Sequence, residues 1–400
     1  MSSRREILLG TLGLAATAGL SIGTAAAQRT QNPAAQSDIV PTRPYVAGTA
    51  ERPLDIINLY DLEAEAENVM PKAPFGYIRS GSGDEWTLRE NIRAFDDRQI
   101  LPRYLQGIGV PNTEIEIFGS KLAIPMFVPP AAAHGLAHVS AEKGSAKGAG
   151  DAGALFIAQT LANTSLEEIA QANPGAKWFQ LYYMKDQGLN RELIQRAKAA
   201  GCTAMVFTVD LEWPGNREAD QRNGFVFPPS LPFPNVPNAP VGANLAELTE
   251  IFNRNLTFAD IEFIAKESGQ PVIVKGILTP ENAKECMARG AAGIMVSNHG
   301  GRQLDTVPAS ITALPRIVEA VGPDVPVLLD SGVRRGVHVF KALALGARAV
   351  GVGRPTLYSL ALGGAPGVKS MFDTLNNELQ LAMKLAGCGS IKDITRKFVT

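Results

Sequence analysis

Eight short apolar runs, each long enough for one buried strand, constrain the fold of this chain more than any other feature. They lie between Ala123 and Pro355, and most are separated by segments with apolar residues at helical spacing, such as 165–174, 190–201 and 279–291. Alternating strands and helices predict right-handed βαβ units and a parallel sheet. Eight units over about 270 residues fit an α/β fold of the closed (β/α)₈ type, a TIM barrel, better than an open sheet. The runs are AIPMFVPPA, ALFIAQT, KWFQLYY, TAMVFTVD, PVIVKG, AGIMVSN, VPVLLDSG and RAVGVGRP.

Two segments depart from this alternation. After the fourth run, about sixty residues rich in proline and asparagine separate Asp210 from Pro271. A loop of that length in a compact domain is a lid or a disordered insertion, and we interpret it as a mobile lid over the barrel mouth. Residues 53–122 precede the first run. We expect them to form a helical N-terminal extension packed against the barrel, with a Gly- and Ser-rich turn that places Tyr77 at the mouth.

The N-terminus has the layout of an export signal. Arg4 and Arg5 are followed by an apolar, alanine-rich run and then by three alanines that end at Ala27. This order predicts a cleavable signal peptide, and the adjacent arginines indicate the twin-arginine route. A retained membrane anchor is the alternative, but the run is short and interrupted by glycines. We therefore expect a periplasmic mature protein from about Gln28. The chain divides into a signal peptide (1–27), a linker or arm (28–52) and one barrel domain (53–400).

Composition and residue spacing exclude several functional classes. A hydrophobic content of 45% and a charged content of 19% exclude wholesale disorder. A formal net charge of -1 gives no electrostatic case for a nucleic-acid partner. The three cysteines form no closely spaced pair, so buried thiols are expected rather than disulfides or metal ligands. His134, His138 and His338 lack spaced carboxylate or cysteine partners, which indicates structural histidines and no metal site.

A cluster of polar residues, SNHGGRQLD at positions 297–305, follows the sixth apolar run. In a barrel of parallel strands, catalytic groups collect in the loops after the strands. A histidine of near-neutral pKa suits proton abstraction, and a carboxylate stabilises its protonated form. Two arginines facing the same mouth suit a substrate carboxylate. We therefore predict an active site for an anionic substrate, built from His299, Asp210, Arg217, Arg302, Tyr77 and Tyr182.

The remaining strand ends predict a ligand with a phosphate and a flat polar ring. DSGVRRG and GVGRP each place glycine and arginine after one of the last two runs, where TIM barrels commonly bind phosphate. Gln180, Thr208 and Lys275 end earlier runs with hydrogen-bonding side chains. A lysine that ends a buried run is costly unless it meets a negative partner. The N1–C2=O region of a reduced flavin is one such partner.

Taken together, these motifs closely resemble the FMN-dependent 2-hydroxy-acid oxidase family over residues 53–400. SNHGGRQLD is its most specific motif, and AAHGLAH and GNREAD are similar to the lactate oxidase branch. The resemblance implies FMN as cofactor, a homotetramer, His299 as base with Asp210 as its partner, and Arg217 and Arg302 as carboxylate ligands. Tyr77 and Tyr182 would contact substrate oxygens. The predicted flavin contacts are Pro130, Ala131, Ala132, Gln159, Gln180, Thr208, Lys275, Ser297, Asp330, Ser331, Gly332, Arg334, Gly353 and Arg354.

Three positions depart from the family pattern. Gln159 stands where relatives usually have a serine, Leu161 where they have Trp or Tyr, and Phe227 replaces a lid tyrosine. We expect a more apolar pocket that accepts larger 2-hydroxy acids. Oxygen is the expected electron acceptor, which makes the chain an oxidase that releases hydrogen peroxide. A quinone- or cytochrome-linked dehydrogenase, an FMN-barrel isomerase and a non-catalytic periplasmic binding protein for hydroxy acids are the alternatives.

Overall fold

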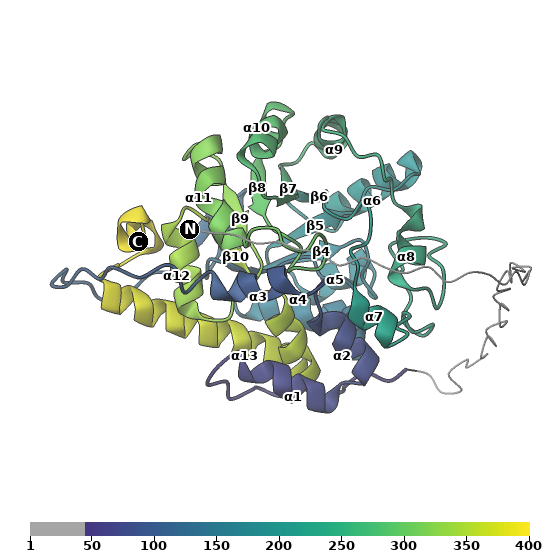
Figure 1. The fold of residues 1–400 in the computed structure, drawn as a ribbon, viewed down its shortest axis with the longest axis horizontal. Helices are drawn as coiled ribbons and strands as arrows, with labels where there is room; N and C mark the ends of the chain where they lie inside the picture. Colours follow the sequence, from purple (N-terminus) through teal and green to yellow (C-terminus); the bar gives the residue numbers. More distant parts are fainter. Residues whose placement is uncertain (1–44) are drawn as a thin grey trace, which may run out of the picture. The chain divides into compact units, whose positions relative to one another are not determined.

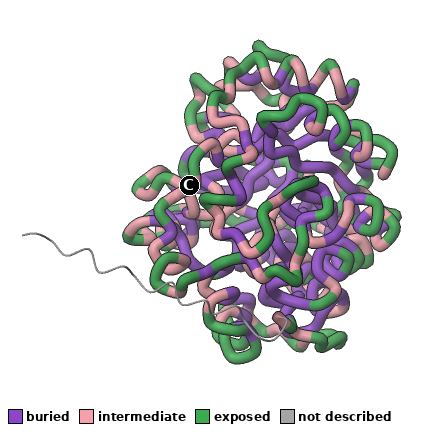
Figure 2. Tube along the Cα trace, turned by 90° about the vertical axis from the view of Figure 1, so that its right-hand side faces the viewer, coloured by how far each residue is buried: buried purple, intermediate pink, exposed green. Residues whose placement is uncertain are grey.

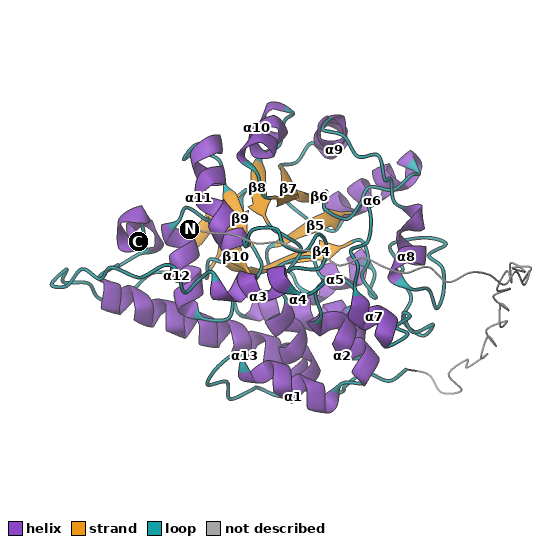
Figure 3. Cartoon of the chain, in the orientation of Figure 1, coloured by secondary structure: helices purple, strands orange, loops and turns teal. Residues whose placement is uncertain are grey.

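Eight parallel strands close into a barrel at the centre of the structure, a computed structural model that describes residues 45–400. The strands pair in chain order, and the last, β10, pairs with the first, β3. Figure 3 shows the strands at the centre of the domain with helices around them. Each predicted apolar run forms one strand, so the predicted (β/α)₈ barrel is confirmed. The strands are β3 (Met126–Val128), β4 (Leu155–Gln159), β5 (Lys177–Leu181), β6 (Met205–Thr208), β7 (Val272–Ile277), β8 (Gly293–Val296), β9 (Val327–Leu329) and β10 (Ala349–Gly351).

Helices surround the barrel and connect successive strands (Figure 1). Their starts follow local capping chemistry: Ser165 and Glu168 form a reciprocal capping box, and Thr279 caps a helix that begins with Pro280. The connecting helices are α4 (Ala141–Asp151), α5 (Leu166–Ala172), α6 (Gln187–Ala199), α9 (Ala259–Ser268), α10 (Pro280–Ala288), α11 (Ser310–Val321) and α12 (Gly336–Ala344), and α13 (Arg354–Ala386) follows the last strand.

The strands are mainly apolar because both of their faces are buried, and most of their polar residues lie toward the C-terminal ends, as Gln159, Thr208 and Lys275 do. Side chains alternate between two clusters: Leu155 and Ile157 of β4 belong to one, and Phe156 and Ala158 to the other. Figure 2 shows the buried residues concentrated in the interior of the domain.

A short antiparallel hairpin, β1 (Ile115–Ile117) and β2 (Ser120–Leu122), packs against the first of these clusters. Ser120 of the hairpin accepts a hydrogen bond of 3.1 Å from the indole of Trp178, at the start of β5. The hairpin therefore lies at the N-terminal end of the barrel, which leaves the C-terminal end for the site.

Two further segments lie around the barrel, as predicted. The N-terminal extension forms α1 (Asp61–Val69), α2 (Lys72–Arg79) and α3 (Trp86–Arg93). The segment between β6 and β7 contains α7 (Glu218–Arg222), α8 (Leu245–Leu248) and a 3₁₀ turn at Thr249–Ile251. It buries the side chains Phe225, Phe227 and Phe233. We call residues 211–258 the lid segment.

The predicted signal peptide and most of the predicted arm lie outside the described residues, 45–400. Within that range, no helix is long and apolar enough to cross a membrane. The three cysteines are buried and free, as predicted.

Candidate active site

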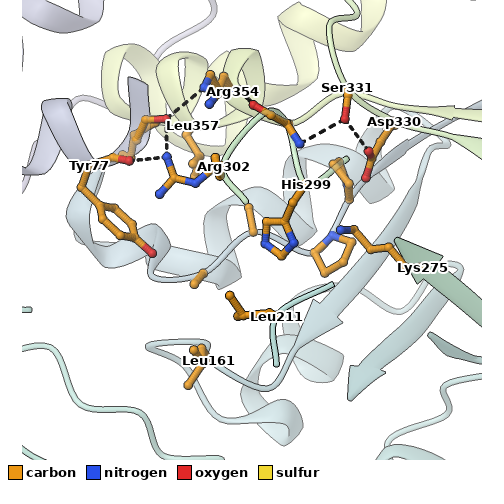
Figure 4. Close-up of a pocket in the computed structure, with 18 of the residues that line it drawn as sticks. Tyr77, Leu161, Leu211, Lys275, His299, Arg302, Asp330, Ser331, Arg354 and Leu357 are labelled. Carbon is orange, nitrogen blue, oxygen red and sulfur yellow. Dashed lines mark hydrogen bonds between the residues drawn. The ribbon is translucent and has the colours of Figure 1, made fainter. Parts of the chain in front are cut away.

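A pocket opens at the C-terminal ends of the barrel strands, and every strand or the loop after it contributes to its wall (Figure 4). About 920 Å³ of space free of protein atoms, part of it open to solvent, lies between its walls. The structure thus brings together residues that are up to 280 positions apart in the chain, from Tyr77 to Leu357. The predicted site residues that line it are Tyr77, Pro130, Ala131, Ala132, Tyr182, Arg217, Lys275, His299, Arg302, Asp330, Ser331, Gly332, Arg334, Gly353 and Arg354.

His299, in the loop after β8, contacts Asp210, in the loop after β6. The imidazole Nδ1 lies 2.8 Å from a carboxylate oxygen of Asp210, and the His299 backbone N–H donates to the Ser297 hydroxyl at 3.1 Å. Burial lowers the pKa of His299, while the Asp210 charge opposes this. Burial raises the pKa of Asp210, but the charges of His299 and Lys275 leave it below its ordinary value. The pair is therefore a neutral imidazole that donates to an ionised carboxylate, with Nε2 free to accept a proton.

Two arginines carry positive charge into the pocket without an acidic partner. Among residues 45–400, neither Arg217 nor Arg302 forms an ion pair. Arg302 donates instead to the backbone oxygens of Tyr77 and Ser80 at the C-terminal end of α2, at 2.6 and 2.8 Å (Figure 4 shows the first). Burial, followed by the charge of Arg302, lowers the pKa of Arg217 to about 10. Arg217 therefore remains charged at neutral pH, and this part of the pocket suits an anion.

Two tyrosines complete this end of the pocket. The guanidinium carbons of Arg302 and Arg217 lie 4.8 and 5.8 Å from the centre of the Tyr77 ring. Burial, and then the Asp210 charge, raises the pKa of Tyr182 above its ordinary value. Tyr182 therefore keeps its phenolic proton and is available as a hydrogen-bond donor.

Three neighbouring strands present buried donors that lack a hydrogen-bond partner among the described residues. These atoms are Gln180 Nε2 on β5, Thr208 Oγ1 on β6 and Lys275 Nζ on β7. The Gln180 amide is oriented by the Thr160 N–H, which donates to its oxygen at 3.4 Å. An unpaired buried donor costs about 1–3 kcal/mol, so three together indicate a bound ligand with several acceptors. The pyrimidine edge of an isoalloxazine ring, with its O2, N1 and O4 acceptors, fits this set.

Gln159, which pairs with Gln180 in the sheet, presents a hydrogen-bond acceptor instead of a donor. Its amide nitrogen donates to the buried carboxylate of Glu142 at 3.1 Å, which leaves its oxygen without a partner in the described chain. Glu142 also accepts from the backbone N–H groups of His134 and Asn163. Gln159 therefore offers an acceptor where its neighbours offer donors.

The far end of the pocket has the features predicted for a phosphate. Helix α13 begins at Arg354 and directs its N-terminus toward the pocket. Gly332 has φ +83°, and an added Cβ would lie 2.0 Å from the Asn91 carbonyl oxygen, so only glycine fits there. Arg354 is largely committed to backbone carbonyls: it donates to those of Ile78, Arg79, Ser80 and Gly300 at 2.8–3.1 Å. Burial, and then the Arg302 charge, lowers its pKa to about 9.

Some predicted residues lie behind the pocket wall, and some wall residues had no sequence signal. Gln159, Gln180, Thr208 and Ser297 are buried at or beside strand ends without being part of the wall, and the partly buried Asp210 also lies outside it. Leu161 lines the pocket as predicted, whereas Phe227 packs edge-on against the Tyr77 ring, with 5.2 Å between ring centres. The unpredicted wall residues are Ile78, Pro129, Leu211, Leu245, Gly300, Val333, Gly351 and Leu357. Gly300, Val333 and Gly351 belong to the motifs at 297–305, 330–336 and 351–355, whereas isolated apolar residues such as Ile78, Leu211, Leu245 and Leu357 carry no motif that would have identified them.

The other three histidines have structural partners. His134 and His138 contact the Ser145 and Ser140 hydroxyls through Nδ1, each at 2.7 Å. His338 stacks on Phe95 with ring centres 4.3 Å apart. Among the described residues, no group of three or more His, Cys, Asp or Glu side chains is arranged to hold a metal ion.

Comparison with known proteins agrees with this geometry. A family model described as FMN-dependent dehydrogenase matches residues 66–400. The chain is 45% identical to L-lactate oxidase of Streptococcus iniae over 88% of this chain and 87% of that one. It is 41% identical to glycolate oxidase 1 of Zea mays over 86% and 96% of the two chains.

Two solved structures are similar over most of their length. A lactate oxidase structure from Pediococcus acidilactici superposes with a TM-score of 0.84 at 46% identity, covering 88% of this chain and 96% of that one. A mandelate oxidase structure with bound (S)-2-phenylpropionate superposes with a TM-score of 0.80 at 40% identity, covering 86% and 98%.

Proposed function

Since the chain belongs to the FMN-dependent dehydrogenase family, we propose that it oxidises an (S)-2-hydroxy acid of the lactate type to the 2-oxo acid. FMN is its cofactor and, when bound, would supply the acceptor for the two electrons released as the substrate's Cα–H bond breaks, and oxygen would reoxidise it to give hydrogen peroxide. A quinone- or cytochrome-linked dehydrogenase with the same chemistry is the second candidate.

One observation carries this proposal: the buried Arg217 and the half-buried Arg302, neither of which forms an ion pair within residues 45–400, line the same pocket as His299, which is paired with Asp210. A 2-hydroxy acid presents a carboxylate and a hydroxyl on adjacent carbons, so a single small molecule can satisfy both features. A protein that only bound the acid would need the arginines but would have no use for a base.

The chain's own residues can perform three tasks in this reaction. Arg217 and Arg302 bind and orient the carboxylate with charge-assisted hydrogen bonds. His299 Nε2 accepts the hydroxyl proton, and the ionised Asp210 stabilises the imidazolium that results. Tyr182, a phenol held 8% exposed at the pocket wall, donates a hydrogen bond toward the substrate oxygens. The donors Gln180, Thr208 and Lys275 would hold the flavin ring.

The substrate side chain would meet an apolar surface. Leu161 follows β4, and Leu211 and Leu245 come from the lid segment; all three line the pocket. Such a surface stabilises a buried CH₂ group by about 0.8 kcal/mol. We therefore propose that kcat/KM rises from L-lactate to 2-hydroxy acids with longer aliphatic side chains, and a steady drop along that series would contradict it.

We also propose a cellular location and an assembly. The paired arginines Arg4 and Arg5 before an alanine-rich run support twin-arginine export to the periplasm, with a mature chain from about Gln28. The family resemblance supports a homotetramer, and sizing chromatography that gave a monomer at micromolar concentration would contradict it.

Anaerobic reduction of the purified protein by L-lactate tests the activity. The protein should be yellow and lose its colour under lactate, because the flavin takes up the substrate's electrons. Recovery of colour in air with one hydrogen peroxide per pyruvate supports an oxidase. Recovery with a quinone but not with air supports a dehydrogenase. A yellow protein that no 2-hydroxy acid bleaches would contradict both.

A further inference from the structure

Gln303 uses all of its hydrogen-bonding capacity on one loop, the first residues after β6. Its amide nitrogen donates to the backbone oxygens of Asp210 and Trp213 at 2.6 and 2.8 Å. Its amide oxygen accepts from the Gly215 backbone N–H at 3.2 Å and from Arg217 Nη2 at 3.3 Å. A glutamine amide has two donor hydrogens and two acceptor lone pairs, so no capacity remains unused.

This arrangement is specific for an amide. Two carbonyl oxygens face the nitrogen, and two N–H groups face the oxygen, so the orientation of the amide is fixed by its partners. Glutamate would set a carboxylate against two carbonyl oxygens, and methionine would leave all four groups unpaired. Glycine is also required nearby: a Cβ on Gly215 would lie 2.4 Å from the Arg302 carbonyl oxygen.

The four contacts connect the two halves of the site. At one end of the loop is Asp210, whose carboxylate holds His299. At the other end is Arg217, whose Nε also donates to the Arg302 carbonyl oxygen at 3.2 Å. These bonds hold two of the guanidinium N–H groups in place and leave the others free for an anion. The backbone of Asp210 and the side chain of Arg217 are therefore held by one amide.

We propose that Gln303 is a positioning residue that sets the Arg217 guanidinium at a fixed place relative to the His299–Asp210 pair. Gln303 does not line the pocket, and it acts through Arg217. This inference rests on the proposed function, because it assigns a purpose to the carboxylate-binding arginine.

Gln303→Met, made in the full-length holoenzyme, tests the proposal. Pyruvate is titrated into the oxidised enzyme and its binding followed through the flavin absorption spectrum. Flavin reduction by L-lactate is measured anaerobically. Losing a hydrogen bond to a charged group should raise the pyruvate dissociation constant and the KM for lactate about tenfold, with a smaller fall in the limiting rate. FMN content should stay at the parental level. Gln221→Met is the matched control, since Gln221 is exposed and its side-chain amide donates to Asn216 in the same segment.

A double-mutant cycle with Arg217→Lys tests whether Gln303 acts through Arg217. If Gln303 acts through Arg217, the lysine change weakens pyruvate binding in the parent but adds little in the Gln303→Met background. Additive effects would overturn the proposal, as would pyruvate binding and KM within twofold of the parent.

Gln303→Glu provides a second variant of nearly the same shape. Its carboxylate beside Arg217 should compete with the substrate carboxylate for the guanidinium. It should also offset the Arg217 charge, which adds to the effect of burial in lowering the His299 pKa. Pyruvate should therefore bind more weakly, and the acidic limb of the kcat/KM profile should move to higher pH. An unmoved limb together with parental pyruvate affinity would overturn the proposal. A parental enzyme that lactate does not reduce would instead contradict the proposed function itself.

Discussion

At the residue scale, the central feature is a histidine held in an unusual backbone conformation. His299 has φ +57°, in the left-handed region that non-glycine residues seldom adopt. The turn is held from both sides: the preceding residue, Asn298, exchanges side-chain hydrogen bonds of 2.7 and 2.8 Å with Asn91, and the Ser297 hydroxyl accepts from the His299 N–H. A conformation of this kind costs about 1–3 kcal/mol and persists where the surroundings over-determine it. Here it directs the imidazole toward Asp210.

Replacing His299 by alanine should separate cofactor binding from chemistry. Among the described residues that line the pocket, His299 is the one imidazole, and a positioned base contributes about 10²–10⁴-fold in rate. His299→Ala should therefore retain FMN while anaerobic flavin reduction by lactate slows by at least a hundredfold. His138→Ala, which removes a buried imidazole outside this pocket, should leave the rate unchanged. A near-parental rate in His299→Ala would show that another group is the base.

The pH dependence should follow the lowered pKa of His299. The base must be neutral to accept a proton, so kcat/KM should rise with pH through a pKa below 6.5 and then level off. Asp210 favours the protonated form, because its charge raises the His299 pKa. Asp210→Asn should consequently move the acidic limb to lower pH and lower the plateau. A limb that moves to higher pH would mean that Asp210 does not act on His299 in this way.

At the element scale, a bulge in β7 shapes the site. The pairing of β7 with β8 shifts register between Lys275 and Ile277, and the intervening Gly276 has φ +107°. Bulges near active sites redirect side chains. A Cβ on Gly276 would lie 2.7 Å from the Cβ and Cγ of Asp210. The bulge therefore allows β7 to carry Lys275 into the pocket while its backbone passes close to the carboxylate that holds the base.

Gly276→Ala should slow flavin reduction in addition to lowering the stability of the fold. Gly269→Ala is the matched control: Gly269 also has a positive φ, of +59°, but a Cβ there would meet nothing within 4 Å. Both variants should lose stability: the αL conformation of Gly269 costs a non-glycine residue about 1–2 kcal/mol, and Gly276→Ala should cost more because its Cβ also overlaps Asp210. Only Gly276→Ala should also slow flavin reduction, because Asp210 is displaced. Thermal unfolding and anaerobic reduction of both variants would check this, and equal rates would contradict it.

At the scale of the whole molecule, the two ends of the barrel have separate roles. The hairpin β1–β2 packs against the barrel at its N-terminal end, and α2, the lid segment and all eight strand ends meet at the other. Arg302 and Arg354 both donate to the last carbonyls of α2. The N-terminal extension is thus part of the site's wall rather than a separate unit.

Export is the prediction that belongs to the whole chain. Replacing both Arg4 and Arg5 by lysine keeps the charge but removes the paired arginines that the twin-arginine route requires. The precursor should then accumulate in the cytoplasm, with its flavin bound. Cell fractionation and immunoblotting compare the variant with the parent, and normal export of the variant would contradict the prediction.

The sequence by itself determined the barrel, the order of its strands and most of the site's polar residues. An apolar run of strand length is a local property, because a strand with both faces buried is nearly continuously apolar. A polar cluster directly after such a run is local too, so His299, Lys275 and the glycine–arginine motifs could be placed at the same end of the barrel. Leu161, where the family has Trp or Tyr, could also be identified from the sequence because it directly follows an apolar run.

The tertiary structure decided which of these residues touch. The His299–Asp210 bond joins positions 89 residues apart, and the bonds from Gln303 to the loop after β6 span 86–93 residues. Leu211 and Leu245 reach the pocket from a segment whose course no motif predicts. Arg354, expected on the cofactor, gives most of its donors to α2 and Gly300. Contacts of this kind arise only when the barrel closes and the lid segment and the extension pack over its mouth. Barrel closure sets the distances between the strand ends, and local sequence patterns do not specify those distances.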